Sequence, residues 1–318
     1  MGETALLSRI AALAGSGGRG HILLGPGDDC AVVRFPKNSV MLATADDMAE
    51  GTHFLNPRGD AGRLAAKLLR INLSDLAGMG AATPVCVLCS ASFPADTPAS
   101  WLEEFVRALS RECRLFKAPL AGGNLSRSGK FHLSMTAIGA AREADIIKRS
   151  GARPGDLLFT LGPLGEAKAG LELYYGKARH LRGAFRKTLL DAFWRPMPLL
   201  KEARVLSRLR LASALMDNSD GLYKSAGYLS QASGCGAEIS LEENCVSSAL
   251  SAYCRKTGAD WRAYALSGGE DYGLVCAVPP AKAAALRRAL PQARLAGKFT
   301  AGSGVRTGMV HAKPYEHF

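Results

Sequence analysis

Five short acidic segments, placed at turns and strand ends, constrain the fold of this chain more than any other feature. They are GDD at 27–29, ATADDMAEGTHF at 43–54, NLSDLAGMGA at 72–81, MDNSDGL at 216–222 and SGGEDYGL at 267–274. A single segment of this kind is usually a turn or a helix cap, as Ser74 and Asp75 illustrate. If five of them converge, cations must offset the repulsion among their carboxylates. We therefore expect a fold that gathers distant loops around hard divalent ions such as Mg²⁺.

The composition is that of an ordinary soluble protein with two domains. The chain has 318 residues, which exceeds the usual size of one domain, and 47% hydrophobic and 21% charged residues are typical of globular chains. The 40 Lys and Arg exceed the 28 Asp and Glu by 12, but they are spread singly, and the densest stretch, 177–187, has only one aromatic residue. Such a surface suits a small phosphorylated substrate and does not indicate nucleic-acid binding.

The cysteines predict a reduced, cytoplasmic protein. Most of the eight lie in apolar runs, which is typical of buried thiols. Cys86 and Cys89 have the CxxC spacing of a zinc or redox pair, but they fall within an expected strand, PVCVLCSASF. Residues three apart in a strand point to opposite faces, so we expect both thiols to be structural.

Signals for secretion, membrane insertion and the common nucleotide loops are not found in the sequence. Apolar residues between Leu6 and Ala14 recur at helical spacing, and Glu3 and Arg9 do not fit a secretory signal, so an amphipathic helix is expected there. No apolar run reaches the roughly 18 residues of a membrane span. GSGGRG at 15–20 lies between an expected helix and a strand, the reverse of the dinucleotide-binding order, and no GxxxxGK[ST] occurs.

We expect a mixed α/β protein of the α+β class with a strand-rich first half. Strands are predicted there at 21–25, 30–35, 40–45, 84–93 and 131–140, and helices at about 60–80 and 98–117. The second half opens with a turn and strand within 149–162. It continues with helices at 165–175, 183–208 and 220–233 and strands near 213–216, 237–240 and 272–278. The domain boundary is expected near residues 140–148.

Eight segments together carry a resemblance to a known family. They are GPGDDCAVV, LATADDMAEGTHF, KLLRINLSDLAGMGAATP, LAGGNLSRSG, RSGARPGDLLFTLGPLGEAKAGL, MDNSDGL, SGGEDYGL and KPYEHF. In order and spacing they resemble the thiamine-monophosphate kinase family, over nearly the whole chain. That family is related to aminoimidazole ribonucleotide synthetase, selenophosphate synthetase and a hydrogenase maturation protein, which handle ATP without a P-loop. The GTHF, GGEDY and YEHF segments favour the thiamine branch.

The resemblance implies a PurM-like two-domain fold and a kinase reaction. Residues 1–142 would form an N-terminal domain that binds ATP and Mg²⁺ and pairs with a second copy through its sheet, and residues 143–318 a C-terminal α/β domain. The implied reaction transfers phosphate from ATP to thiamine monophosphate, with several Mg²⁺ ions, in a cytoplasmic homodimer. No nucleic-acid or membrane partner is expected.

The resemblance also implies which residues form the site, with no certain catalytic side chain. Matches to magnesium ligands are Asp29, Thr44, Asp46, Asp75, Asn124, Asp217 and Asp220. Matches to ATP contacts are Gly123, Asn124, Arg149 and Ser219. Matches to the thiamine phosphate site are His53, Glu270 and Tyr315, where an aromatic ring and a carboxylate suit a flat cationic thiazolium.

Three positions depart from the family pattern, and they leave two alternatives open. Ala45 stands where a hydroxyl is usual, Asn124 where an aspartate is usual, and Asn218 where an aliphatic residue is usual. Weaker Mg²⁺ binding, compensation by Asp47 or altered activity would each fit these changes. The alternatives are another ATP-using enzyme of the superfamily, which activates a carbonyl or similar oxygen, and a low-activity protein that only binds nucleotide or thiamine phosphates.

Overall fold

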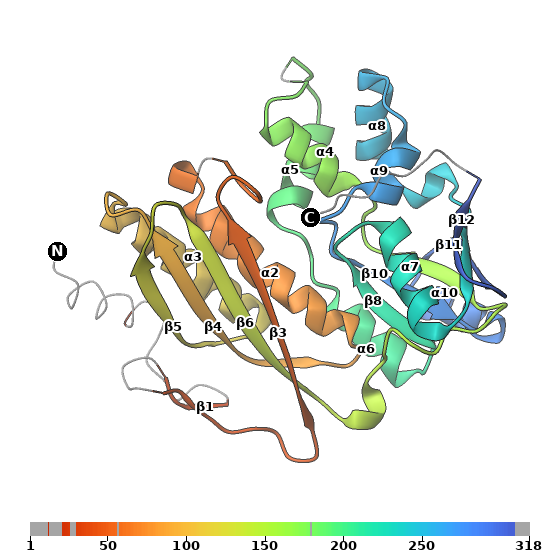
Figure 1. Ribbon diagram of the computed structural model, residues 1–318, viewed down its shortest axis with the longest axis horizontal. Helices are drawn as coiled ribbons and strands as arrows, with labels where there is room; N and C mark the ends of the chain where they lie inside the picture. The colour runs from red at the N-terminus through yellow and green to blue at the C-terminus, as the bar shows by residue number, and fades with distance from the viewer. Residues whose placement is uncertain (1–11, 13–20, 26–29, 56, 179, 309–318) are drawn as a thin grey trace. The chain divides into compact units, whose positions relative to one another are not determined.

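Figure 1 shows the computed structural model of the chain, which describes residues 12, 21–25, 30–55, 57–178 and 180–308. The chain divides into two units. One unit comprises Met1–Leu76 and Ala82–Glu143, and the other comprises Ala77–Ala81 and Ala144–Phe318. The helix expected between Leu6 and Ala14 lies outside the described residues, apart from Ala12.

The first unit is built on a four-stranded sheet of order β3-β6-β4-β5. Its strands are β3 (Val40–Ala49), β6 (His132–Ala141), β4 (Thr83–Phe93) and β5 (Leu120–Arg127). The pairs β3–β6 and β6–β4 are antiparallel, whereas β4–β5 is parallel. Strands β1 (Ile22–Leu24) and β2 (Val32–Val33) form a separate two-stranded sheet.

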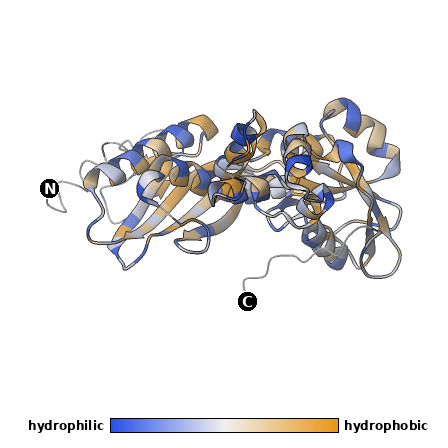
Figure 2. Cartoon of the chain, turned by 90° about the horizontal axis from the view of Figure 1, so that it is seen from above, coloured by the Kyte–Doolittle hydropathy of each residue, from blue (hydrophilic) through white to orange (hydrophobic). Residues whose placement is uncertain are grey.

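Two amphipathic helices, α2 (Ala61–Gly78) and α3 (Ala99–Phe116), cover one face of this sheet (Figure 1). Trp101 of α3 packs edge-on to Phe93 of β4, with ring centroids 5.5 Å apart, and its indole Nε1 donates to the Pro57 carbonyl at 2.7 Å. Arg70 of α2 forms an ion pair with Glu112 of α3 at 2.8 Å. In Figure 2 hydrophobic and hydrophilic residues mix along the helices, as amphipathic helices on a sheet require.

The pleat of β3 decides which of its side chains face the helices. Thr44 and Asp46 pair in register with buried Ala137 and Met135 of β6, so all four lie on the helix-covered face. Ala45, between Thr44 and Asp46, lies on the opposite face. We call that second face, which carries Met41, Ala43, Ala45 and Asp47 of β3, the open face of the sheet.

The second unit is a six-stranded sheet with helices on both faces. Its order is β12-β9-β11-β7-β10-β8, and every pair is antiparallel except β12–β9. The strands are β7 (Leu157–Leu161), β8 (Ala214–Asn218), β9 (Gly236–Ile239), β10 (Gly273–Val278), β11 (Arg294–Thr300) and β12 (Gly304–Thr307). All six residues of β10 are buried, because both faces of the sheet are covered.

Two apolar clusters fill the two sides of this sheet. On one side Leu158 and Val275 pack with α4 (Glu166–Tyr174), α5 (Phe185–Trp194), α7 (Leu222–Ser233), α8 (Ser248–Thr257) and α9 (Trp261–Ser267). On the other side Phe159 and Cys276 pack with α6 (Leu200–Arg208) and α10 (Ala283–Ala289). Four 3₁₀ turns complete the described elements: Pro57–Gly59, Glu143–Asp145, Glu243–Cys245 and Pro280–Lys282.

Three helices of the second unit share one hydrogen-bond acceptor. The Glu172 carboxylate of α4 accepts from the hydroxyl of Tyr253 on α8 at 2.8 Å and from that of Tyr264 on α9 at 2.7 Å, and Lys177 lies 3.0 Å away. Burial raises the pKa of Glu172, but the bonds from Tyr264, Tyr253 and Lys177 outweigh it and hold that pKa below its usual value. Burial and the same carboxylate raise the pKa of both tyrosines.

Most predicted elements are present, with one wrong and several missed. The helix predicted over 183–208 is wrong, because Pro196 and Pro198 lack the amide hydrogens that a continuous helix needs, and the segment forms α5 and α6 instead. Strands β5, β11 and β12 and helices α8, α9 and α10 were not predicted. Within the described ranges, no helix combines the length and apolar character needed to cross a bilayer.

The eight cysteines carry free thiols. Seven of them are buried, as predicted, whereas Cys30 is exposed. Cys86 pairs with Ile138 and Cys89 with Met135, so the two thiols of the CxxC segment point to opposite faces of β4. That prediction is confirmed.

Candidate functional site

In the first unit, strand β3 and helix α2 bring two carboxylates and a hydroxyl together. The Thr44 hydroxyl donates to Oδ2 of Asp75 at 2.5 Å. Asp46 lies two residues along the same face of β3. Its burial raises the pKa of its carboxyl to about 7, and the charges of Asp75 and Asp47 add to the rise. The negative charge of these carboxylates is therefore not neutralised by the hydrogen bond that the Thr44 hydroxyl donates.

Asn72 holds the backbone of this site in place. Its Oδ1 accepts from the amide of Asp46 at 3.0 Å, and its Nδ2 donates to the Leu68 carbonyl one helical turn earlier at 2.9 Å. The side chain is fully buried. Sequence reasoning quoted Asn72 within NLSD but gave it no role, because only the fold shows that it reaches β3.

The donor set fits a hard cation. Thr44, Asp46 and Asp75 offer only oxygen atoms, which Mg²⁺ prefers. A divalent ion would also relieve the carboxylate repulsion that adds to the effect of burial on the Asp46 pKa. Among the described residues, no cluster of three or more His, Cys, Asp or Glu side chains is placed to hold a metal. The predicted ligand Asp29 lies outside the described residues.

Gly123 and Asn124 lie on the edge strand β5, away from this group. A Cβ atom on Gly123 would come within 1.9 Å of the Cys89 carbonyl oxygen, so only glycine fits there. Asn124 pairs with Ser90 of β4 and therefore lies on the open face, opposite to the face of Asp46. Strands β6 and β4 lie between β3 and β5, a separation of about 14 Å across three strand spacings. Within one chain, Asn124 is not brought together with Thr44, Asp46 and Asp75.

His53 is held in the tight turn that follows β3. Its Nδ1 accepts from the amide of Ala49 at 3.0 Å, and its own amide donates to the Ala49 carbonyl at 3.0 Å. The ring is half-buried. With Nδ1 acting as an acceptor, the hydrogen of a neutral ring is on Nε2.

In the second unit, the predicted residues Asp217, Ser219 and Asp220 lie at the end of β8. Asp217 is buried and pairs with Leu274 of β10, and Gly221 begins α7 with a φ of 92°. Between them, buried Asn218 accepts from the Ser225 hydroxyl at 2.9 Å through Oδ1. Its Nδ2 is buried without a hydrogen-bond partner among the described residues. The usual aliphatic residue would avoid that cost.

Glu270 lies in a loop that is bonded to the end of β8. Its amide donates to the Ser219 carbonyl at 2.6 Å, and the amide of Tyr272 donates to the Asn218 carbonyl at 3.0 Å. Gly269, Glu270 and Tyr272 have φ values of 61°, 59° and 51°, in the left-handed region. The backbone of Glu270 is therefore held to Ser219 by a hydrogen bond in a strained loop.

Asp271, between Glu270 and Tyr272, is the buried carboxylate of the same loop. Its Oδ2 accepts from the Gly165 amide at 2.6 Å and its Oδ1 from the Ala167 amide at 3.1 Å, at the start of α4. Burial raises the pKa of Asp271 to about 8, the two amides oppose the rise, and the Glu166 and Glu270 carboxylates add to it. Sequence reasoning gave Asp271 no role, although it belongs to the quoted GGEDY segment.

Arg149 is exposed near the start of the second unit. Its guanidinium lies over the ring of Tyr228 at 5.8 Å, and its carbonyl accepts from the Ser233 hydroxyl at 3.4 Å. The planar guanidinium of Arg149 has the shape needed to bind two phosphate oxygens at once. The last predicted residue, Tyr315, lies outside the described residues.

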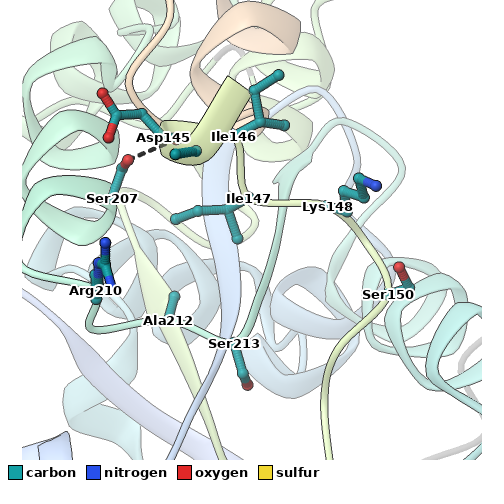
Figure 3. A pocket seen from close by; sticks show the side chains of 10 residues that line it. Asp145, Ile146, Ile147, Lys148, Ser150, Ser207, Arg210, Ala212 and Ser213 are labelled. Atoms are coloured by element: carbon teal, nitrogen blue, oxygen red, sulfur yellow. Dashed lines mark hydrogen bonds between the residues drawn. The ribbon is translucent and has the colours of Figure 1, made fainter. Parts of the chain in front are cut away.

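A cavity of about 440 Å³ in the second unit contains none of the predicted site residues (Figure 3). Lys148 and Arg210 contribute cationic side chains to its lining, together with Ile147 and Ser213. Ser207, which also lines the cavity, donates to the Asp145 carbonyl at 2.5 Å. The cavity is therefore a feature separate from the site built by β8 and the Glu270 loop.

Comparisons with known proteins match both units. Residues 27–141 match the family described as AIR synthase related protein, N-terminal domain, and residues 153–309 match its C-terminal domain. The thiamine-monophosphate kinase of Escherichia coli (strain K12) is 35% identical over 289 residues, which cover 91% of this chain and 86% of that protein.

Two solved structures have the same fold over nearly the full length. The thiamine-monophosphate kinase from Stenotrophomonas maltophilia K279a matches with a TM-score of 0.82 and 31% identity, covering 97% of both chains. A structure described as AaThiL complexed with AMPPCP and TMP matches with a TM-score of 0.79 and 32% identity, covering 100% of this chain and 97% of that one. The PurM-like two-domain fold implied by the sequence is confirmed.

Proposed function

Since this chain belongs to the AIR synthase related proteins and, within them, to the thiamine-monophosphate kinases, we propose that it transfers the γ-phosphoryl group of ATP to thiamine monophosphate by direct, Mg²⁺-assisted in-line transfer. The products are ADP and thiamine diphosphate. The observation that carries the proposal is the Thr44–Asp75 pair beside Asp46, a set of oxygen donors with excess negative charge.

The acceptor explains why no catalytic base is needed. A phosphate monoester has a second pKa of about 6, so thiamine monophosphate is largely ionised at neutral pH and can attack directly. Phosphoryl transfer passes through a loose transition state, in which alignment and charge neutralisation supply most of the catalysis. In the first unit, the two carboxylates and the hydroxyl of Asp46, Asp75 and Thr44 match this requirement.

Thr44, Asp46 and Asp75 would hold Mg²⁺ in the first unit. When bound, Mg²⁺ neutralises phosphate charge and orients the phosphate oxygens. Asp46 must then be ionised, and Asn72 keeps its backbone in position. Asp29, Asp217, Asp220 and Asn124 remain proposed ligands.

The second unit supplies the proposed contacts to the two substrates. Arg149 suits the triphosphate because its planar fork binds two oxygens at once, and Ser219 adds a hydroxyl donor. Glu270 carries a negative charge that suits the cationic thiazolium, and its loop is tied to the Ser219 carbonyl. Gly123, His53 and Tyr315 complete the proposed set of substrate contacts.

The proposal includes a homodimer that pairs through the open face of the four-stranded sheet. Met41 is 63% exposed and Leu88 is 36% exposed on that face, and a second copy paired there would cover both side chains. A second copy paired there would place Asn124 at the dimer interface. Asn124 would then contribute to a site at that interface and not to the group around Asp46 in its own chain. Residues 1–142 would then be the ATP, Mg²⁺ and dimerisation domain. Sedimentation velocity tests the dimer, and Leu88→Glu should shift it to a monomer.

The activity is tested with the purified chain, ATP, MgCl₂ and thiamine monophosphate, and thiamine diphosphate is measured by chromatography of its thiochrome derivative. Thiamine, a carboxamide and water serve as competing acceptors. Formation of thiamine diphosphate with equal ADP supports the proposal. ADP formed with another acceptor and no thiamine diphosphate would show a different enzyme of the superfamily. Binding of both ligands without turnover would show a binding protein.

A further inference from the structure

The start of α4 is capped by a residue from a distant loop. Gly165 is the N-cap position of α4 and has no side chain, so it cannot cap the helix itself. Asp271 lies 106 residues later in the sequence, and its carboxylate takes the Gly165 amide at 2.6 Å and the Ala167 amide at 3.1 Å. The two bonds and the helix dipole favour the ionised form of Asp271 and so oppose the rise in its pKa that burial causes.

Backbone contacts leave no room for a side chain at Gly165 or Gly268. A Cβ on Gly165 would lie 2.6 Å from the backbone and Cβ of Tyr264, and a Cβ on Gly268 would lie 2.4 Å from the Tyr264 carbonyl oxygen. The same atom would lie 2.8 Å from the Gly165 Cα. The α4 start, the end of α9 and the loop at 268–272 therefore interlock through bare backbone. The side chain of Asp271 joins the loop to the α4 start through two hydrogen bonds.

The two neighbours of Asp271 are bonded in another direction. The amides of Glu270 and Tyr272 donate to the carbonyls of Ser219 and Asn218, at the end of β8. Both neighbours have positive φ values, 59° and 51°, a left-handed conformation that is unfavourable for residues with a side chain. A conformation of this kind persists only where surrounding bonds determine it. Asp271 supplies the bonds on one side, and the end of β8 supplies those on the other.

We infer that Asp271 is a positioning residue that fixes Glu270 for the acceptor substrate by anchoring the strained loop 268–272 to the α4 N-terminus. This inference rests on the proposed function, in which Glu270 faces the cationic thiazolium. Asp271 itself is 1% exposed, so we assign it no direct contact with the substrate. Its role is to keep the loop in the binding conformation before thiamine monophosphate arrives.

The first test compares Asp271→Asn with a matched control. An amide oxygen can accept one of the two bonds, but the amide nitrogen then faces the other N–H group. Asp271→Asn should raise the KM for thiamine monophosphate by about 10- to 100-fold, because small displacements of a positioned group are costly. The KM for ATP should change by less than about twofold, since Arg149 lies outside the loop and the loop is bonded to Ser219 only through the backbone carbonyl of Ser219.

Asp156→Asn is the control. Asp156 is also buried in the second unit and accepts from a backbone amide, that of Arg153 at 3.1 Å, and from the Ser213 hydroxyl at 2.7 Å. The Asp156→Asn variant should lose about as much thermal stability as Asp271→Asn, while its KM values for ATP and thiamine monophosphate stay unchanged. If Asp271→Asn lowers Tm as much as Asp156→Asn and leaves the KM for thiamine monophosphate unchanged, Asp271 is structural only and the inference is wrong.

A second measurement uses the wild-type chain and does not depend on a variant that folds. Hydrogen exchange followed by mass spectrometry should show slow exchange of the segments at 163–168 and 268–273 in the free protein. Adding thiamine monophosphate should slow the exchange of these two segments only slightly. Fast exchange in the free protein that slows only with thiamine monophosphate would overturn the inference, because the loop would then be ordered by the substrate. If the wild type makes no thiamine diphosphate, the proposed function fails. The exchange rate in the free protein still shows whether Asp271 anchors the loop.

Discussion

The Thr44 hydroxyl donates to the Asp75 carboxylate at 2.5 Å and so joins an edge strand to the helix that covers it. The bond orients a carboxylate whose charge acts on Asp46. Like charges held this close in a half-buried position destabilise a fold, so their presence indicates a function. We therefore take this pair as the centre of the candidate magnesium site.

Asp75→Asn should lower kcat/KM for phosphoryl transfer by at least about 100-fold, because it removes charge from the magnesium site while keeping the side-chain shape. Initial rates at limiting and saturating Mg²⁺ check this. Asp96→Asn is the control, since Asp96 is an exposed carboxylate of the same unit that pairs with Arg58 at 2.7 Å. Equal rates for the two variants at limiting Mg²⁺ would remove Asp75 from the metal site.

Mg²⁺ binding should strengthen as the pH rises from 6 to 8. The pKa of Asp46 is raised to about 7 by burial and by neighbouring carboxylates, so below pH 7 the group carries a proton in the metal-free protein. Mg²⁺ must displace that proton, and the affinity should rise by up to about tenfold per pH unit below pH 7 and level off above it. Calorimetry in two buffers of different ionisation enthalpy should show proton release at pH 6.5 and almost none at pH 8.5. A Kd for Mg²⁺ that is the same at pH 6 and pH 8 would contradict the prediction.

Gly123→Ala should destabilise the first unit by about 1–3 kcal/mol, because the new Cβ would lie 1.9 Å from the Cys89 carbonyl oxygen and β5 must move away from β4. Gly129→Ala is the matched control in the turn that follows β5, where a Cβ meets nothing within 4 Å. Its effect should stay within about 0.5 kcal/mol. Urea unfolding measures both changes, and the KM for ATP should rise only in Gly123→Ala. Similar unfolding midpoints for the two variants would show that β5 adapts without cost.

Asn218→Val combined with Ser225→Ala should stabilise the second unit by about 1 kcal/mol, because the pair removes a buried unpaired Nδ2 together with both partners of one hydrogen bond. Valine also suits the buried strand β8. Ser225→Ala alone should destabilise by a similar amount, since it leaves Oδ1 of Asn218 unpaired as well. The double-mutant cycle is read by thermal unfolding. A double variant less stable than Ser225→Ala alone would show that Asn218 contributes packing that valine cannot replace.

Much of the fold was predictable because it depends on local pattern. The alternating residues of β3 and β4 and the apolar spacing of α2 and α3 predicted those elements directly. Strand β5, with the sequence LAGGNLSR, was missed because its glycines weaken any strand signal, and it pairs only because β4 offers a free edge. Pro196 and Pro198 mark the break between α5 and α6 in the sequence, but the predicted helix over 183–208 runs through both of them.

The candidate site was predictable in its residue types and not in its grouping. Sequence spacing cannot show that Thr44 and Asp46 face α2 while Ala45 faces the open side, since that depends on which face the helices cover. It likewise cannot show that Asp271 reaches an amide 106 positions away. Asn72 and Asp271 were missed for one reason: each acts on backbone groups, for which sequence motifs give no direct signal.

The shared acceptor Glu172 also gives the second unit an optical reporter of its own. The chain has eight tyrosines, and two of them, Tyr253 and Tyr264, keep their hydrogens in solutions alkaline enough to ionise exposed phenols, because burial and the carboxylate raise their pKa. Tyrosinate absorbance in an alkaline titration should therefore appear in two phases. The second phase, from Tyr253 and Tyr264, would report the pH at which α4, α8 and α9 separate. No label needs to be added to the protein.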